Sequence, residues 1–219
     1  MWSITVWEKV GLDVVYMLWD DKDGYIVLAR GDLSGYAEGR ALRSATSVNI
    51  AKFLQEEMVC CHGILKRIVL DGETENLGFT EELMKQYGIH SISIAPYHPQ
   101  SNGLVERGHQ TIINAIAKYC AADNIKNRAP QIMNWTRYLS LALWADRITT
   151  RRSTGYTAFE LIYGRECLLP IQLTVDSCSV IDWDGIKDHE DLIMARMKQL
   201  DERQIIETEA AQNVRRSRI

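Results

Sequence analysis

The chain lacks several features that would assign it to a class of proteins at once. No apolar run approaches the roughly eighteen residues of a membrane-spanning helix, and the N-terminus has none of the segments of a secretory signal. The five cysteines include no CxxC pair, so no zinc site of the finger type is indicated. We therefore expect an intracellular protein with no membrane segment and with reduced, mostly buried thiols.

An overall excess of positive charge is also missing, because the formal net charge is −4. The positive charges are nevertheless concentrated, since residues 126–165 carry seven lysines and arginines against only Asp146 and Glu160. A local basic face can bind phosphate on an acidic protein, but an arginine-rich solvated surface would give the same pattern. The composition, with 46% apolar and 25% charged residues, is that of a globular protein.

The first half of the chain predicts a mixed β-sheet. Residues 9–43 contain three apolar runs separated by turn residues at 21–24 and 31–35, which predicts an antiparallel meander. The runs that follow predict a helix from Thr46 or Ser47 to about Cys60, a strand at 64–71, a helix at 80–87 and a strand at 89–95. A meander followed by alternating helices and strands favours a mixed sheet with helices on its faces.

The second half is predicted to be helical. Apolar periodicity predicts helices at about 102–121 and 130–146, and a short helix that ends at Tyr163. We expect three parts: a core at 1–173, a linker at 174–184 and a long amphipathic helix with a basic tail at 185–219. The last part could be a spacer, a partner-binding coil or a frayed tail.

Three acidic residues are the strongest candidates for a functional site. Asp13 lies within an apolar run predicted to be a buried strand, Asp71 ends a second apolar run, and Glu106 falls in the first turns of a helix. An ionised carboxylate in an apolar strand is costly unless it is paired or binds a cation. Three that converge would suit one or two hard divalent ions, which can clamp the attacking and leaving oxygens of a phosphodiester.

The loop before Glu106 carries a resemblance to a known family. The run Ala95-Pro96-Tyr97-His98-Pro99-Gln100-Ser101-Asn102-Gly103-Leu104-Val105-Glu106-Arg107 resembles the signature of integrase catalytic domains, most closely those of gypsy-type LTR retrotransposons. Residues 71–76 resemble the segment around the second catalytic aspartate of that family, and residues 143–147, 153–157 and 161–164 are similar to elements that follow the core. The resemblance covers about residues 8–173.

This resemblance implies a ribonuclease H-like α/β fold, in which a five-stranded mixed sheet is flanked by helices and a helical extension follows. It implies a catalytic triad of Asp13, Asp71 and Glu106 that holds two Mg²⁺ or Mn²⁺ ions, and a reaction that trims element DNA ends and joins them to target DNA. A homo-oligomer in the nucleus is the expected setting. The implied nucleic-acid contacts are Tyr97, Gln100, Asn102 and His109 along the DNA ends, and Arg107, Gln110 and Lys118 as phosphate ligands.

Two departures from the family pattern leave alternatives open. Glu73 stands two residues after Asp71, where the family usually has glycine, and twelve residues before Asp13 leave no room for the family's N-terminal zinc-binding domain. We therefore expect a core excised from a longer polyprotein or the remnant of a decayed element. An inactive or host-adopted relic that binds nucleic acid or a protein is one alternative, and a nuclease that hydrolyses without strand joining is another.

Overall fold

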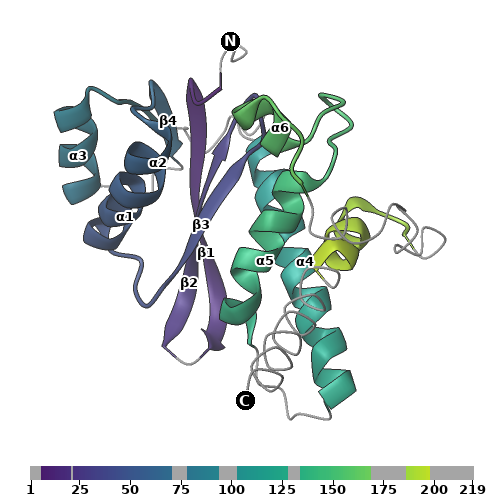
Figure 1. Ribbon diagram of the computed structural model, residues 1–219. Helices are drawn as coiled ribbons and strands as arrows, with labels where there is room; N and C mark the ends of the chain where they lie inside the picture. The colour runs from purple at the N-terminus through teal and green to yellow at the C-terminus, as the bar shows by residue number, and fades with distance from the viewer. Residues whose placement is uncertain are drawn as a thin grey trace, which may run out of the picture.

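The computed structural model describes residues 6–20, 22–70, 78–93, 103–127, 134–168 and 186–197, with the backbone alone at 93, 103–107 and 123–127. It contains a five-stranded mixed sheet with the strand order β3-β2-β1-β4-β5. Helices α1 to α3 lie on one side of this sheet and helices α4 to α6 on the other (Figure 1). The predicted five-stranded mixed sheet flanked by helices is confirmed.

The meander predicted for residues 9–43 is confirmed. β1 (Lys9–Asp20) pairs antiparallel with β2 (Asp23–Gly31), which pairs antiparallel with β3 (Ala37–Leu42). β4 (Arg67–Leu70) and β5 (His90–Ser93) extend the other edge in parallel. Side chains of β2 alternate between the two hydrophobic clusters, with Ile26 and Leu28 in one and Val27 and Ala29 in the other. Both faces of the sheet are therefore covered.

The prediction that β1 is buried along residues 10–17 is only half right. Val10 and Leu12 are buried, whereas Tyr16, Leu18 and Trp19 are each about two-thirds exposed. The cause is the length of the neighbouring strand, because β4 pairs with β1 only between Lys9 and Gly11. Among the described residues, the second half of β1 has β2 as its one paired strand.

The helix predicted from Thr46 to Cys60 is present but not uniform. It consists of α1 (Ser47–Phe53), a π-helical segment (Leu54–Val59) and α2 (Cys60–His62). Of the two predicted N-cap candidates it is Thr46 that caps the helix, and its side chain accepts a hydrogen bond from the backbone N–H of Asn49. The expectation of mostly buried thiols is wrong for Cys60 and Cys61, which are exposed, although Cys120 is buried.

The remaining predicted helices are present, although the one predicted at 102–121 continues to Asn127 and the one predicted at 130–146 begins at Trp135. They are α3 (Phe79–Tyr87), α4 (Gly103–Asn127), α5 (Trp135–Ile148) and α6 (Ala158–Tyr163). The start of α5 is capped by a residue far away in the sequence. The backbone N–H and the hydroxyl of Thr136 donate to Oδ2 of Asp20 at 2.9 and 2.7 Å. Asp20 is the last residue of β1, so this contact fixes the end of that strand to α5.

The described part of the C-terminal segment packs on the core. Residues 189–197 form a helix, and Ile193 and Met197 are fully buried in the same cluster as α4 and α5. The helix begins at 189, four residues later than the predicted start at 185, because residues 186–188 are not helical. The predicted linker at 174–184 and residues 198–219 lie outside the described residues. No helix within the described ranges is long and apolar enough to cross a membrane.

Candidate functional site

Asp13 of β1 and His109 of α4 meet at the face of the sheet covered by α4. Nδ1 of His109 lies 3.3 Å from Oδ2 of Asp13. The two side chains differ in access to solvent, because Asp13 is 28% exposed and His109 only 1%. The Asp13 carboxylate is therefore accessible to a ligand from solvent, while the buried His109 ring contacts it from the interior of the protein. The same burial leaves His109 almost no surface for the DNA contact that the resemblance implied.

The surroundings of His109 favour a neutral ring. Burial lowers the pKa of His109, the hydrogen bond to Asp13 opposes this, and the nearby charge of Arg30 lowers the pKa further. A neutral imidazole has one N–H, and a carboxylate partner requires that proton on Nδ1. Nε2 is then a buried acceptor, and the described residues supply it with no hydrogen-bond partner.

The other two predicted triad positions are placed by backbone alone. Glu106 lies in α4 three residues before His109, so its position is on the same side of the helix, one turn earlier. On the sheet, β1 and β4 run parallel and pair Gly11 with Val69. Asp13 and Asp71 each follow this pair by two residues along the sequence. Asp71 itself lies outside the described residues, and the side chain of Glu106 is not among those described.

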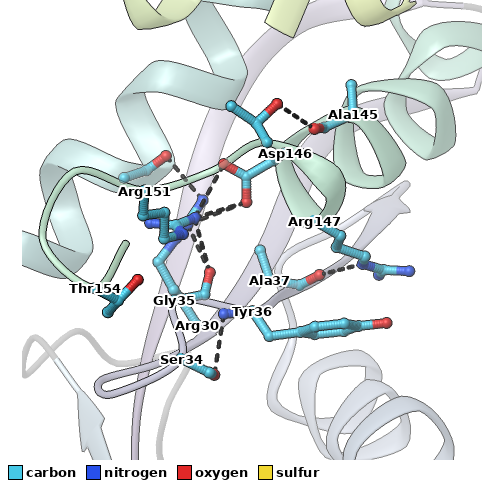
Figure 2. Close-up of polar contacts among 12 residues, drawn as sticks. Arg30, Ser34, Gly35, Tyr36, Ala37, Ala145, Asp146, Arg147, Arg151 and Thr154 are labelled. Carbon is cyan, nitrogen blue, oxygen red and sulfur yellow. Dashed lines mark hydrogen bonds and ion pairs between the residues drawn. The ribbon is translucent and has the colours of Figure 1, made fainter. Parts of the chain in front are cut away.

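A buried ionic cluster holds α4 next to Asp13. Arg30 of β2 donates from Nη2 to the carbonyl of Gly108 at 2.9 Å and from Nη1 to Oδ2 of Asp146 at 3.2 Å. Figure 2 shows Arg151 on the same carboxylate, and both guanidinium groups donate to the carbonyl oxygen of Gly35. A Cβ at position 108 would lie 2.8 Å from Nε of Arg30, so only glycine allows this approach.

The charges of this cluster stabilise one another. Burial alone would raise the pKa of Asp146, but Arg30 and Arg151 outweigh it and hold that pKa below its ordinary value. Burial lowers the pKa of Arg30 to about 10, against the opposing effect of Asp146. At neutral pH Arg30 and Asp146 are therefore both charged.

Several predicted phosphate ligands contact other parts of the protein. Lys118 lies within 3.4 Å of carboxylate oxygens of Asp188, Glu190 and Asp191, next to the helix at 189–197. Gln110 is exposed on α4 and donates to Asn114 at 2.7 Å. Among the basic residues at 126–165, Arg147 and Arg151 form ion pairs with Glu38 and Asp146. The basic stretch is thus partly used to hold the fold together.

The remaining predicted residues are not brought together by the described part of the structure. Tyr97, Gln100 and Asn102 lie outside the described residues, and the side chain of Arg107 is not described. Within the described ranges, no group of three or more His, Cys, Asp or Glu side chains could hold a metal ion. The structure thus gives one of the three predicted carboxylates, Asp13, together with its partner His109.

Sequence reasoning missed the ionic cluster of Arg30, Asp146 and Gly108. A signal was present, because Arg30 directly follows the apolar run Tyr25-Ile26-Val27-Leu28-Ala29 within β2, much as Asp13 lies in the apolar run of β1. A charged residue in an apolar strand implies a buried partner. The sequence could not show that Asp146, 116 residues away, is that partner.

Comparison with known proteins gives related sequences and structures, although no family model matches the chain. It is 25% identical over 166 residues to the retrovirus-related Pol polyprotein from transposon 412 of Drosophila melanogaster, which covers 74% of this chain. It is 32% identical over 141 residues to the Pol polyprotein of feline endogenous virus ECE1, which covers 64% of this chain. The chain spans only 13% of the length of each of these relatives.

The fold is that of retroviral integrase catalytic cores. The catalytic core domain of BIV integrase superposes with a TM-score of 0.54 at 22% identity, covering 72% of this chain and 94% of that one. The HTLV-2 core domain in complex with magnesium, in a trimeric form, gives 0.55 at 19% identity, covering 73% and 99%. The simian T-cell lymphotropic virus intasome bound to the PP2A regulatory subunit B56 gamma gives 0.62 at 17% identity, covering 77% and 59%.

Sequence and fold thus agree: the chain is similar in sequence to the Pol polyproteins of a transposon and of an endogenous virus, and its fold is that of retroviral integrase catalytic cores.

Proposed function

We propose that this chain is the integrase catalytic core of a gypsy-type LTR retrotransposon, and that it carries out metal-dependent phosphoryl transfer on DNA. The reaction would trim element ends and join them to target DNA. The observation that carries the proposal is the contact between Asp13 and His109, which joins β1 to α4 one helical turn from position 106. Similarity to the Pol polyprotein of transposon 412 supports the choice of element.

The donors of the proposed site fit a hard divalent ion. Asp13, Asp71 and Glu106 would hold Mg²⁺ or Mn²⁺ through carboxylate oxygens, the ligands these ions prefer. Asp13 is partly exposed and hydrogen-bonded through one oxygen, which leaves acceptor capacity for an ion. When bound, two ions would neutralise charge on the phosphodiester and align the attacking and leaving oxygens.

The protein residues would position DNA around these carboxylates. Tyr97, Gln100, Asn102 and Arg107 stand on either side of the start of α4 in the sequence, and the start of a helix attracts phosphate. Gln110 is exposed on α4, and at Lys118 a phosphate would compete with three carboxylates. We propose DNA ends, target DNA and further copies of the chain as partners, with the nucleus as the site of action.

A matched pair of substitutions tests this proposal. Cleavage and joining of a branched DNA substrate are measured with Mn²⁺ for the native chain, for Glu106→Gln and for the exposed control Glu82→Gln on α3. We expect joined product from the native chain and the control, and none from Glu106→Gln. Equal activity in all three proteins would remove Glu106 from the mechanism.

The relic alternative is favoured by one observation, the carboxylate of Glu73 two residues after Asp71. It predicts a folded protein that neither cleaves nor joins DNA. A Mn²⁺ titration of this inactive protein then separates two explanations. A chain that binds no Mn²⁺ supports the relic. A chain that binds Mn²⁺ but is inactive indicates that the reaction needs other parts of the polyprotein. Hydrolysis without joining would instead indicate a nuclease.

A further inference from the structure

His109 is buried between Asp13 and the ionic cluster, and its position is fixed on both sides. Its ring meets Asp13 through Nδ1 at 3.3 Å. The preceding residue, Gly108, is held through its carbonyl by Arg30 at 2.9 Å. Arg30 is itself 2% exposed and paired with Asp146. The hydrogen bond from Arg30 to Gly108 therefore restricts movement of this part of α4, and with it the imidazole of His109, along the sheet.

We propose that His109 is a positioning residue, whose Nδ1–H orients the carboxylate of Asp13 before a metal ion or DNA binds. This inference rests on the proposed function in one respect, since it takes Asp13 to be a metal ligand. His109 acts through Asp13 and does not itself touch DNA or metal, because its side chain is 1% exposed.

The geometry gives this role a physical basis. The terminal torsion of an aspartate side chain has a broad range of allowed angles. A hydrogen bond from the fixed Nδ1–H of His109 to one carboxylate oxygen of Asp13 selects one of these orientations. The Nδ1–H donates to a carboxylate whether or not the ring carries a second proton. Carboxylates that bind metals are commonly held by such outer hydrogen bonds, whose loss lowers metal affinity by about 10–100-fold.

The unpaired Nε2 of His109 agrees with this role. It is a buried polar atom to which the described residues offer no partner, and such atoms are rare because they reduce stability. The opposite tautomer would place an N–H at this unpartnered position and turn a lone pair toward Asp13. The contact with Asp13 therefore decides which nitrogen carries the proton.

Two substitutions at position 109 separate orientation of Asp13 from simple packing. The amide of His109→Asn reaches the place of Nδ1, whereas the amide of His109→Gln reaches that of Nε2. Both variants lose the ring, and Asn is one methylene shorter than Gln, so packing alone predicts that urea denaturation shows at least as large a loss of stability for Asn as for Gln. Mn²⁺ affinity of the full chain, measured by electron paramagnetic resonance, is expected to stay within about threefold of native for Asn and to fall about tenfold or more for Gln.

A second measurement tests the inference without metal. Nitrogen-15 NMR of the histidine rings is expected to show a proton on Nδ1 of His109 and a change in that signal in Asp13→Asn. Equal Mn²⁺ affinities of the Asn and Gln variants, or an Nδ1 without a proton, would overturn the inference. A native chain that binds no Mn²⁺ but shows the protonated Nδ1 would overturn the proposed function and leave the role of His109 in orienting Asp13 intact.

Discussion

Arg30 and Asp146 form an ion pair in which the two side chains are only 2% and 1% exposed. Both ions have lost their hydration, so the pair is stabilised by mutual attraction and by further hydrogen bonds. These come from Arg151 to the carboxylate, and from Arg30 to the carbonyl oxygens of Gly35 and Gly108. The pair thus joins β2, α4 and α5 behind the proposed site.

Replacing Arg30 by methionine should destabilise the fold strongly. Asp146 would keep only Arg151 as a cationic partner in this cluster, and the Gly108 carbonyl would lose its donor. Removal of one partner of a buried pair typically costs about 3–5 kcal/mol. The free energy of unfolding in urea measures the loss, and the double variant Arg30→Met/Asp146→Leu should recover part of it. A loss below about 1 kcal/mol in the single variant would show that Arg151 alone satisfies Asp146.

The substitution Gly108→Ala should destabilise the protein although it lies in a helix. Alanine favours a helix over glycine by about 1 kcal/mol, but its Cβ would lie 2.8 Å from Nε of Arg30, whose side chain is held at both ends. We expect a net loss of about 1–3 kcal/mol from overpacking. The loss should shrink in an Arg30→Met background, and strict additivity of the two changes would rule out the steric cause.

The helix at 189–197 should behave as part of the core. Ile193 is fully buried against the cluster of α4 and α5, so Ile193→Ala should cost about 2–5 kcal/mol. Thermal and urea unfolding of the full chain measure this cost. The half-buried neighbour Met194 provides the control, and Met194→Ala should cost clearly less. Equal, small losses would mean that the segment detaches in solution.

Acid should weaken the protein partly through His189. The side chain of His189 is exposed at its edge, but partial desolvation lowers its pKa from the ordinary 6.5, although Asp146 opposes the shift. The unfolded chain therefore binds a proton here at a higher pH than the folded protein does. This contribution to stability is complete above about pH 6.5 and is lost as the pH falls toward the lowered folded-state pKa. Stability measured from pH 8 to pH 5.5 should fall less steeply in His189→Gln, and parallel profiles would contradict this.

The sequence predicted most of the fold because its signals were local. Gly88 ends α3 and Gly164 ends α6, both in the left-handed conformation, and such stops are visible as single residues. The exposure of Tyr16 and Trp19 was not predictable, since it depends on how far β4 extends along β1. The π-helical segment at Leu54–Val59 likewise has no plain signal in the sequence.

The candidate site was predictable as a set of residue types but not as a set of contacts. Asp13 was identified by its charge in an apolar strand, and the structure places His109 against it across 96 positions of sequence. Lys118 was expected at phosphate, yet it lies among carboxylates near the helix at 189–197. Pairings of this kind depend on the packing of distant segments, which residue spacing does not encode.

The cap that Asp20 provides for α5 has a consequence for the whole molecule. Strand β1 contacts α5 at its end, α5 contacts β2, β2 contacts α4, and α4 returns to β1 at Asp13. These hydrogen bonds connect β1, α5, β2 and α4 in a ring. Neither α4 nor α5 can therefore slide along the sheet without breaking one of them. The surroundings of Asp13 should therefore open only together with the packing of α4 and α5 on the sheet, as one cooperative unit.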